Sequence, residues 1–284
     1  MASIFKQMKD FIRDSWNEAD EDSAAEQQAT ASAGTATNSS SQPSPATEAN
    51  AGQPESEEAQ AAQQTLERIA RLHQAEIFAC SLAAPFRASA CYDWFSLFKS
   101  SRQDPDPNVV PFHLYSFGDS SALKQDQIDM LRQQQERSFG IEHNEDVLKI
   151  GKNFLSLTGI SLPSLSNVEE MPSPLDGFTF DREDDGVNAW LVSAFASLLV
   201  TGTECNGLPK EQAVQILSEL APVVLRNYQD WEQYAFDFLK TDQLLGINKG
   251  RGAKLLHNTV ESLGFKSGSP WVRYPLSTYR DMAA

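Results

Sequence analysis

The sequence of 284 residues lacks the short motifs that most directly reveal an enzyme. It contains neither a GxSxG nucleophile elbow nor the Walker pattern GxxxxGK[ST], so no serine hydrolase or nucleotide-binding signature is present. Its four histidines, His73, His113, His143 and His257, are scattered along the chain. Scattered residues can still converge in a fold. The sequence nevertheless favours a non-enzymatic protein, and we predict no cofactor.

Cysteine is also scarce, since the chain has only Cys80, Cys91 and Cys205 and no CxxC pair. An odd number of cysteines leaves a free thiol under any disulfide scheme, which favours a reducing compartment. Residues 1–16 interleave charges with apolar positions, unlike the continuous apolar core of a secretory signal. The longest uncharged apolar run, residues 186–203, contains polar side chains and is marginal in length for a membrane span. We therefore expect a cytoplasmic protein.

Large hydrophobic residues are missing between residues 17 and 64, which contain no aromatic residue, Val, Ile, Leu or Met. Such a segment cannot offset the loss of conformational entropy on ordering, roughly 1 to 2 kcal/mol per residue. We therefore predict a disordered linker at residues 18–64. A single folded domain follows at residues 65–276, and residues 277–284 are expected to be a C-terminal tail.

Basic residues are absent from residues 18–67, which carry ten acidic side chains. Residues 1–17 have a net charge of +1, and residues 68–284 have twenty-seven acidic against twenty basic side chains, a net charge of −7. An acidic domain behind an acidic linker repels the phosphate backbone of nucleic acids. We therefore expect no nucleic-acid partner.

The first seventeen residues nevertheless contain a pattern typical of an amphipathic helix. Phe5, Met8, Phe11, Ile12 and Trp16 recur mostly at steps of three and four, which places them on one helix face. With the neighbouring isoleucine, these six side chains stabilise a bound helix by at most about 9 to 18 kcal/mol. Ordering the segment costs a comparable amount. We therefore predict that residues 1–17 form a reversible docking helix.

Three surfaces compete as the target of this helix, and the sequence leaves all three open. An anionic membrane surface attracts basic residues, so residues 3–16 can mediate peripheral membrane binding. A groove on a protein partner suits the same apolar spacing. The third target is the folded domain of the chain itself. The sequence does not identify the partner or the oligomeric state.

Beyond residue 65, helical patterns recur and strand patterns are scarce, which predicts a mainly α domain of about five to eight helices. Apolar spacing predicts a helix from Leu66 that ends before Pro85, and a later helix that Pro222 kinks or breaks. The run "VNAWLVSAFASLLV" is apolar on nearly every face, as expected for a helix at the centre of the core. Asp230 is predicted to cap a further helix, and a last helix is predicted at residues 251–263.

Three segments carry a resemblance to a known family. They are "MLRQQQERSFGIEHNEDVLKIGKNFL" at residues 130–155, "YQDWEQYAFDFLKTDQLLG" at residues 228–246 and "SPWVRYPL" at residues 269–276. In this order they resemble the bacterial family called domain of unknown function 1266, over residues 75–276. The chain departs from that family in its central helix, which reads "WLVSAFASLL" where many relatives carry arginine. The resemblance implies a helical bacterial domain and transfers no activity.

Two clusters before predicted helices contain residues that bind metal ions in other proteins. "FDREDDG" brings Asp181, Asp184 and Asp185 into one turn, where carboxylates suit a hard cation. Acidic residues also cap helices and favour helix N-termini, so we prefer Asp184 or Asp185 as the cap of the central helix. "EHNED" at residues 142–146 offers a histidine and acids, but a helix start explains it equally well and no second ligand cluster is evident.

The most basic local feature is "GINKGRGAK" at residues 246–254, where Lys249, Arg251 and Lys254 precede or begin a helix. Such a loop can present backbone N–H groups and cations to a small anion, although a glycine-rich connection between helices is the simpler explanation. The sequence thus favours an interaction or regulatory protein of the bacterial cytoplasm that docks through the N-terminal helix and a helical surface. The alternative is an enzyme or a small-anion or metal-binding module that uses residues 181–185 or 246–254.

Overall fold

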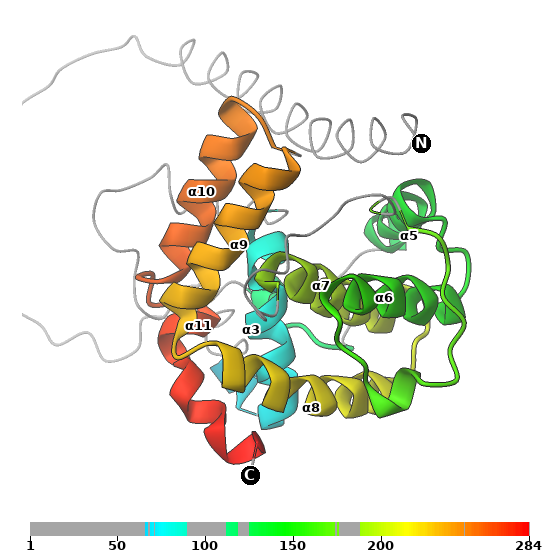
Figure 1. Ribbon diagram of the computed structural model, residues 1–284, viewed down its shortest axis with the longest axis horizontal. Coiled ribbons are helices and arrows are strands. Elements are labelled where there is room, and N and C mark those ends of the chain that lie inside the picture. Colours follow the sequence, from blue (N-terminus) through cyan, green and yellow to red (C-terminus); the bar gives the residue numbers. More distant parts are fainter. Residues whose placement is uncertain are drawn as a thin grey trace, which may run out of the picture.

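The computed structural model describes residues 66–89 apart from 68 and 71, 112–118, 125–175 apart from 174, 188–246 and 248–283 (Figure 1). These residues form helices and no strands, which confirms the mainly α prediction. None of the helices formed by these residues is long and apolar enough to cross a membrane. The elements are α3 (Gln74–Ser89), η1 (Phe112–Leu114), α5 (Gln125–Phe139), α6 (Asn144–Thr158), η3 (Pro163–Leu165), α7 (Ala189–Cys205), α8 (Lys210–Asn227), α9 (Trp231–Leu245), α10 (Arg251–Leu263), α11 (Pro270–Arg273) and η4 (Leu276–Ala283).

The apolar helix α7 lies at the centre of the domain, as predicted. It packs against α3, α5, α6, α8 and α9, and nearly all of its residues are buried (Figure 1). Its N-cap is Asn188, whose side chain accepts a hydrogen bond from the Leu191 backbone N–H at 3.1 Å. The prediction that Asp184 or Asp185 caps this helix is therefore wrong. Asn188 lies about one turn closer to the apolar run, and its side chain provides the acceptor for a free N–H group in the first turn of α7.

Helix α3 continues through Pro85 to Ser89, so the predicted end before Pro85 is also wrong. Proline has no N–H group, which leaves the carbonyl oxygen of Ser81, one turn earlier, without its helical donor. The Trp271 indole Nε1 donates to this oxygen at 2.8 Å. Helix α8 likewise continues through Pro222. A donor from the far end of the chain thus replaces the bond that Pro85 removes.

The packing of α6 on α7 depends on one glycine. A Cβ atom on Gly151 would lie 2.4 Å from a ring carbon of Phe195, far inside van der Waals contact. Phe195 is fully buried at the centre of α7. The absent side chain therefore lets the two helices approach closely and fixes where α6 crosses α7.

Two residues of η4, near the C-terminal end of the chain, belong to the core: Leu276 and Tyr279. Residues 277–283, predicted to be a tail, belong to the 3-10 helix η4, and the ring of Tyr279 is fully buried. Its ring centroid lies 4.9 Å from that of Phe78, and its hydroxyl is 3.1 Å from Ser81 Oγ. Aromatic contacts with α3 therefore extend the domain beyond residue 276.

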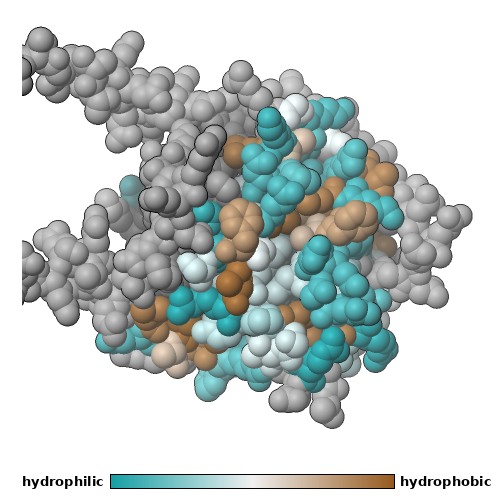
Figure 2. All heavy atoms as spheres, turned by 90° about the vertical axis from the view of Figure 1, so that its left-hand side faces the viewer, coloured by the Kyte–Doolittle hydropathy of each residue, from teal (hydrophilic) through white to brown (hydrophobic). Residues whose placement is uncertain are grey.

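Helices α9 and α10 lie side by side at one edge of the domain (Figure 1). Asp230 caps α9 by accepting from the Gln233 N–H at 2.9 Å, and α10 spans residues 251–263, both as predicted. The face of the molecule that Figure 2 shows carries hydrophobic residues in separate patches between hydrophilic ones. Individual exposed apolar side chains therefore interrupt a largely polar surface.

Candidate functional site

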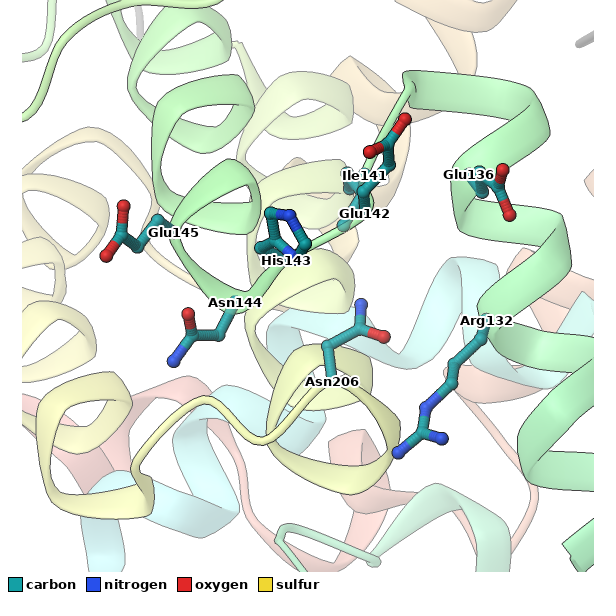
Figure 3. Close-up of a pocket in the computed structure, with 8 residues that line it drawn as sticks. All are labelled: Arg132, Glu136, Ile141, Glu142, His143, Asn144, Glu145 and Asn206. Atoms are coloured by element: carbon teal, nitrogen blue, oxygen red, sulfur yellow. The ribbon is translucent and has the colours of Figure 1, made fainter.

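A recess of about 770 Å³ lies where the end of α5, the start of α6 and the end of α7 meet. We call it the α5–α6 recess. Figure 3 shows His143 and Asn206 at its centre, between the α5 residues on one side and the α6 residues on the other. Its lining residues are Arg132, Glu136, Ile141, Glu142, His143, Asn144, Glu145 and Asn206.

The turn between α5 and α6 forms one wall of the recess. Gly140 ends α5 in the left-handed region, with φ of 69°, and its N–H donates to the Glu136 carbonyl at 2.8 Å. The Asp146 carboxylate then accepts from the backbone N–H groups of His143 and Glu142, at 3.0 and 3.3 Å. The chain is thereby held in the sharp turn that brings Glu136 of α5 and Glu142 to the same opening.

The carboxyl group of Asp146 serves the fold rather than a ligand. Partial burial opposes its charge, but the hydrogen bonds from Lys149 and from the two backbone N–H groups outweigh burial and lower its pKa. Lys149 Nζ lies 3.0 Å from the carboxylate. Asp146 is therefore ionised and occupied at the helix start, which leaves Glu142 and Glu145 as the free acids of "EHNED" at the recess.

The end of α7 forms the floor of the recess. Arg132 donates through Nε to the Cys205 carbonyl, and Asn206 donates through Nδ2 to Oε1 of Gln135, a buried side chain of α5. These two bonds join α5 to the end of α7 across about seventy residues of sequence. Arg132 and Asn206 are thus held in fixed positions by contacts outside the opening.

The chemistry of the lining is polar and acidic. Glu136, Glu142 and Glu145 are exposed carboxylates, and Arg132 is the only lysine or arginine in the lining. His143 and two asparagines add hydrogen-bonding groups, whereas Ile141 supplies the apolar contact. Lining of this kind binds cations and hydrogen-bond donors, and it contains neither a serine nor a cysteine nucleophile.

A second polar cluster lies fully inside the domain. Arg87 of α3 and Glu204 of α7 form a buried ion pair in which Nη2 and Nη1 lie 2.9 and 3.1 Å from the two carboxylate oxygens. Arg87 also donates to the His113 carbonyl, and the Ser116 hydroxyl donates to Glu204 at 2.6 Å. Each of these hydrogen bonds joins α3, η1 or α7 to a neighbouring segment, so this cluster holds η1 in place.

The two described cysteines are poor nucleophiles. Cys80 and Cys205 are both buried and free. Burial raises the pKa of each thiol to about 12, in both cases as the largest cause. The reactive thiolate is therefore scarce at neutral pH. The structure brings neither thiol together with a histidine base in a solvent-accessible site.

Two of the predicted sites lie outside the described residues. These are the docking stripe, Phe5, Met8, Phe11, Ile12 and Trp16, and the acidic turn of Asp181, Asp184 and Asp185. Among the residues that are described, no three His, Cys, Asp or Glu side chains gather closely enough to hold a metal ion.

The third predicted site, the glycine-rich loop, is shaped by its own contacts. Asn248 donates to the buried carboxylate of Asp242 at 2.8 Å, and Gly250, with φ of 60°, precedes α10 without a side-chain cap. Lys249 and Lys254 are exposed. Arg251 begins α10, and its side chain lies outside the described part. The two lysines are therefore exposed to solvent. No buried polar side chain of the described part lies with them to form an anion site, so the structure adds no support to that hypothesis.

The sequence analysis singled out the segments that supply most of the α5–α6 recess. "EHNED" and the segment at residues 130–155 supply seven of the eight lining residues, although the sequence suggested a helix start rather than a recess there. Asn206 gave no signal, because it follows α7 in a turn with no pattern of its own. Only tertiary packing brings it to the start of α6.

The comparisons with known proteins identify a family for this chain. A family model described as protein of unknown function (DUF1266) matches residues 6–276. Neither a curated protein nor a solved structure matches the chain.

Proposed function

Because the chain belongs to the DUF1266 family, whose description assigns no activity, we propose from the geometry that it is a non-enzymatic interaction or regulatory protein of the bacterial cytoplasm. It engages a protein partner through the α5–α6 recess and the N-terminal docking helix. The observation that carries this proposal is the polar, open lining of the recess, to which three segments of the chain contribute. Small-molecule sites are mostly apolar with a few polar groups, whereas apolar contact here comes from Ile141 alone.

The charge of the lining selects the kind of partner segment. Three glutamates face one arginine, and Arg132 already donates to the Cys205 carbonyl. A partner segment with Lys or Arg side chains complements this lining and is steered toward it by the acidic domain. Contacts of this type weaken as salt screens the charges. The docking helix adds apolar contact that salt does not weaken.

The test is a pull-down from bacterial cytoplasm with the full chain as bait, followed by direct binding measurements on the protein recovered. Phe11→Asp disrupts the docking stripe, and Glu142→Lys combined with Glu145→Lys reverses the charge of the recess. We expect each change to lower the affinity for that partner at least tenfold. Glu211→Lys, at an exposed position of α8, is the matched control and keeps the wild-type affinity.

Circular dichroism verifies that every variant keeps a folded helical domain. Equal affinity of the wild type and both variants for every recovered protein contradicts the proposal. If only the recess variant loses binding, the recess is part of the partner interface and the docking helix is not.

A further inference from the structure

Helix α9 carries two exposed apolar side chains on its outer face. Phe236 and Leu244 are 72% and 75% exposed, the highest values among the large hydrophobic residues of the described part. They lie eight residues apart with the exposed Lys240 midway, so all three follow one stripe along the helix. We call this stripe the α9 outer face. Met130, Phe265 and Val272, the other exposed hydrophobics in that part, lie on different elements.

We propose that the α9 outer face is the intramolecular docking site of the N-terminal helix at residues 3–16. This inference goes beyond the proposed function, because it identifies the resting place of the docking helix before any partner arrives. A partner then has to displace the contact. Access to the apolar side chains of residues 3–16 then depends on the contact with the α9 outer face as well as on the affinity of this segment for its partner.

The two stripes match in length and character. Phe236 to Leu244 spans about 12 Å along α9, and Phe5 to Trp16 spans about 16 Å if helical, at 1.5 Å per residue. Packing one helix on the other removes apolar side chains on both sides from water, which favours the contact. On α9, Phe236 and Leu244 are the large hydrophobic side chains that are exposed.

The chain that joins the two stripes is long enough for them to meet. About fifty residues separate the docking helix from the start of the domain. A disordered linker of this length, as its composition predicts, has a root-mean-square span of roughly 35 to 42 Å, comparable to a domain of this size. Such tethering gives an effective concentration near the millimolar range. Weak contact is therefore sufficient to keep the helix docked most of the time.

Two further observations favour this occupant. The family model matches residues 6–276, so most of the docking segment and the helical domain lie within one family match. The segment carries a net charge of +1, and residues 68–284 carry −7, so long-range attraction favours the contact within one molecule.

The test is hydrogen–deuterium exchange of the full chain, read by mass spectrometry on peptides from residues 3–16. We expect these amides to exchange about tenfold faster in the Phe236→Asp, Leu244→Asp double variant than in the wild type. Met130→Asp places the same change on α5 and leaves the exchange unchanged. All three positions are exposed, so the domain folds in each variant, which its melting temperature verifies.

Two results overturn the proposal. One is exchange at residues 3–16 that is equal in the wild type and the α9 double variant. The other is protection that rises with protein concentration, which places the docking helix on a second copy. No partner is present in this experiment, so its outcome is independent of the binding measurements that test the proposed function.

Discussion

Asp242 is a buried acidic side chain whose charge is unfavourable inside the domain. It lies on the inner face of α9 and accepts from the Trp190 indole at 3.3 Å and from Asn248 at 2.8 Å. Burial raises its pKa above the ordinary value of 3.8, and the two hydrogen bonds oppose that shift without cancelling it. The carboxyl therefore positions the loop after α9, but its charge destabilises the folded state at neutral pH.

Replacing Asp242 by Asn removes this cost and keeps an oxygen acceptor. The folded state binds the proton of Asp242 more tightly than the unfolded state, so the native carboxyl lowers the free energy of unfolding as pH rises through the raised pKa. We expect Asp242→Asn to raise the urea midpoint at pH 7 and to give no gain below pH 3.8. Asp126→Asn, an exposed change of the same charge, is the control and gives no rise. A lower midpoint for Asp242→Asn at pH 7 contradicts this account.

At the scale of the element, α3 shows how a helix accepts proline in its interior. The Trp271 indole donates to the Ser81 carbonyl that Pro85 leaves free, and the Trp271 ring stacks on Trp231 with centroids 5.4 Å apart. The family-like motif "SPW" therefore completes a helix far away in the sequence. Its proline and tryptophan serve the fold rather than a binding site.

Replacing Trp271 tests how much the stability of the domain depends on the hydrogen bond from its indole to the Ser81 carbonyl. We expect Trp271→Phe to cost about 1 to 3 kcal/mol, because a buried carbonyl loses its donor. Pro85→Ala restores an N–H at residue 85, so the same Trp271→Phe change should cost less in that background. A double-mutant cycle by urea unfolding measures the difference, and strictly additive effects would show that the indole bond does not replace the helical one.

Local patterns predicted the elements whose determinants lie within one turn of the chain. Asp230 and the following apolar spacing placed α9, and the helix predicted at residues 251–263 matches α10. The end of α3 was missed because its missing donor comes from a residue 190 positions later. Asn206 was missed at the recess for the same reason, since the side chain that fixes it lies 71 residues earlier. Periodicity and caps carry no information about such distant partners.

For the molecule as a whole, the C-terminal residues close the core. Tyr279 packs against Phe78 and Trp231 and pairs with Ser81, so η4 covers α3 where a tail was predicted. The local sequence gives no sign that Tyr279 is buried. It is one of six tyrosines in the chain, and it follows a segment that contains proline.

We expect removal of residues 277–284 to destabilise the domain by about 3 to 5 kcal/mol, the range for losing a buried aromatic side chain. At about 2 to 4 °C per kcal/mol for a domain of this size, the melting temperature falls by roughly ten degrees. Differential scanning calorimetry measures this fall, and Tyr279→Ala should reproduce most of it. Arg280→Ala, at an exposed position, should leave the melting temperature nearly unchanged, and an equally stable truncated chain would show that η4 is dispensable.

The contacts of Ser81 with the end of the chain also set an order of events during biosynthesis. Its carbonyl and hydroxyl form hydrogen bonds with residues 271 and 279, which the ribosome adds about 190 residues later. Helix α3 emerges from the exit tunnel early, with an unfilled hydrogen-bond acceptor beside its proline and an uncovered aromatic face. The nascent protein therefore completes the hydrogen bonds of α3 only after residues 271 and 279 have been added.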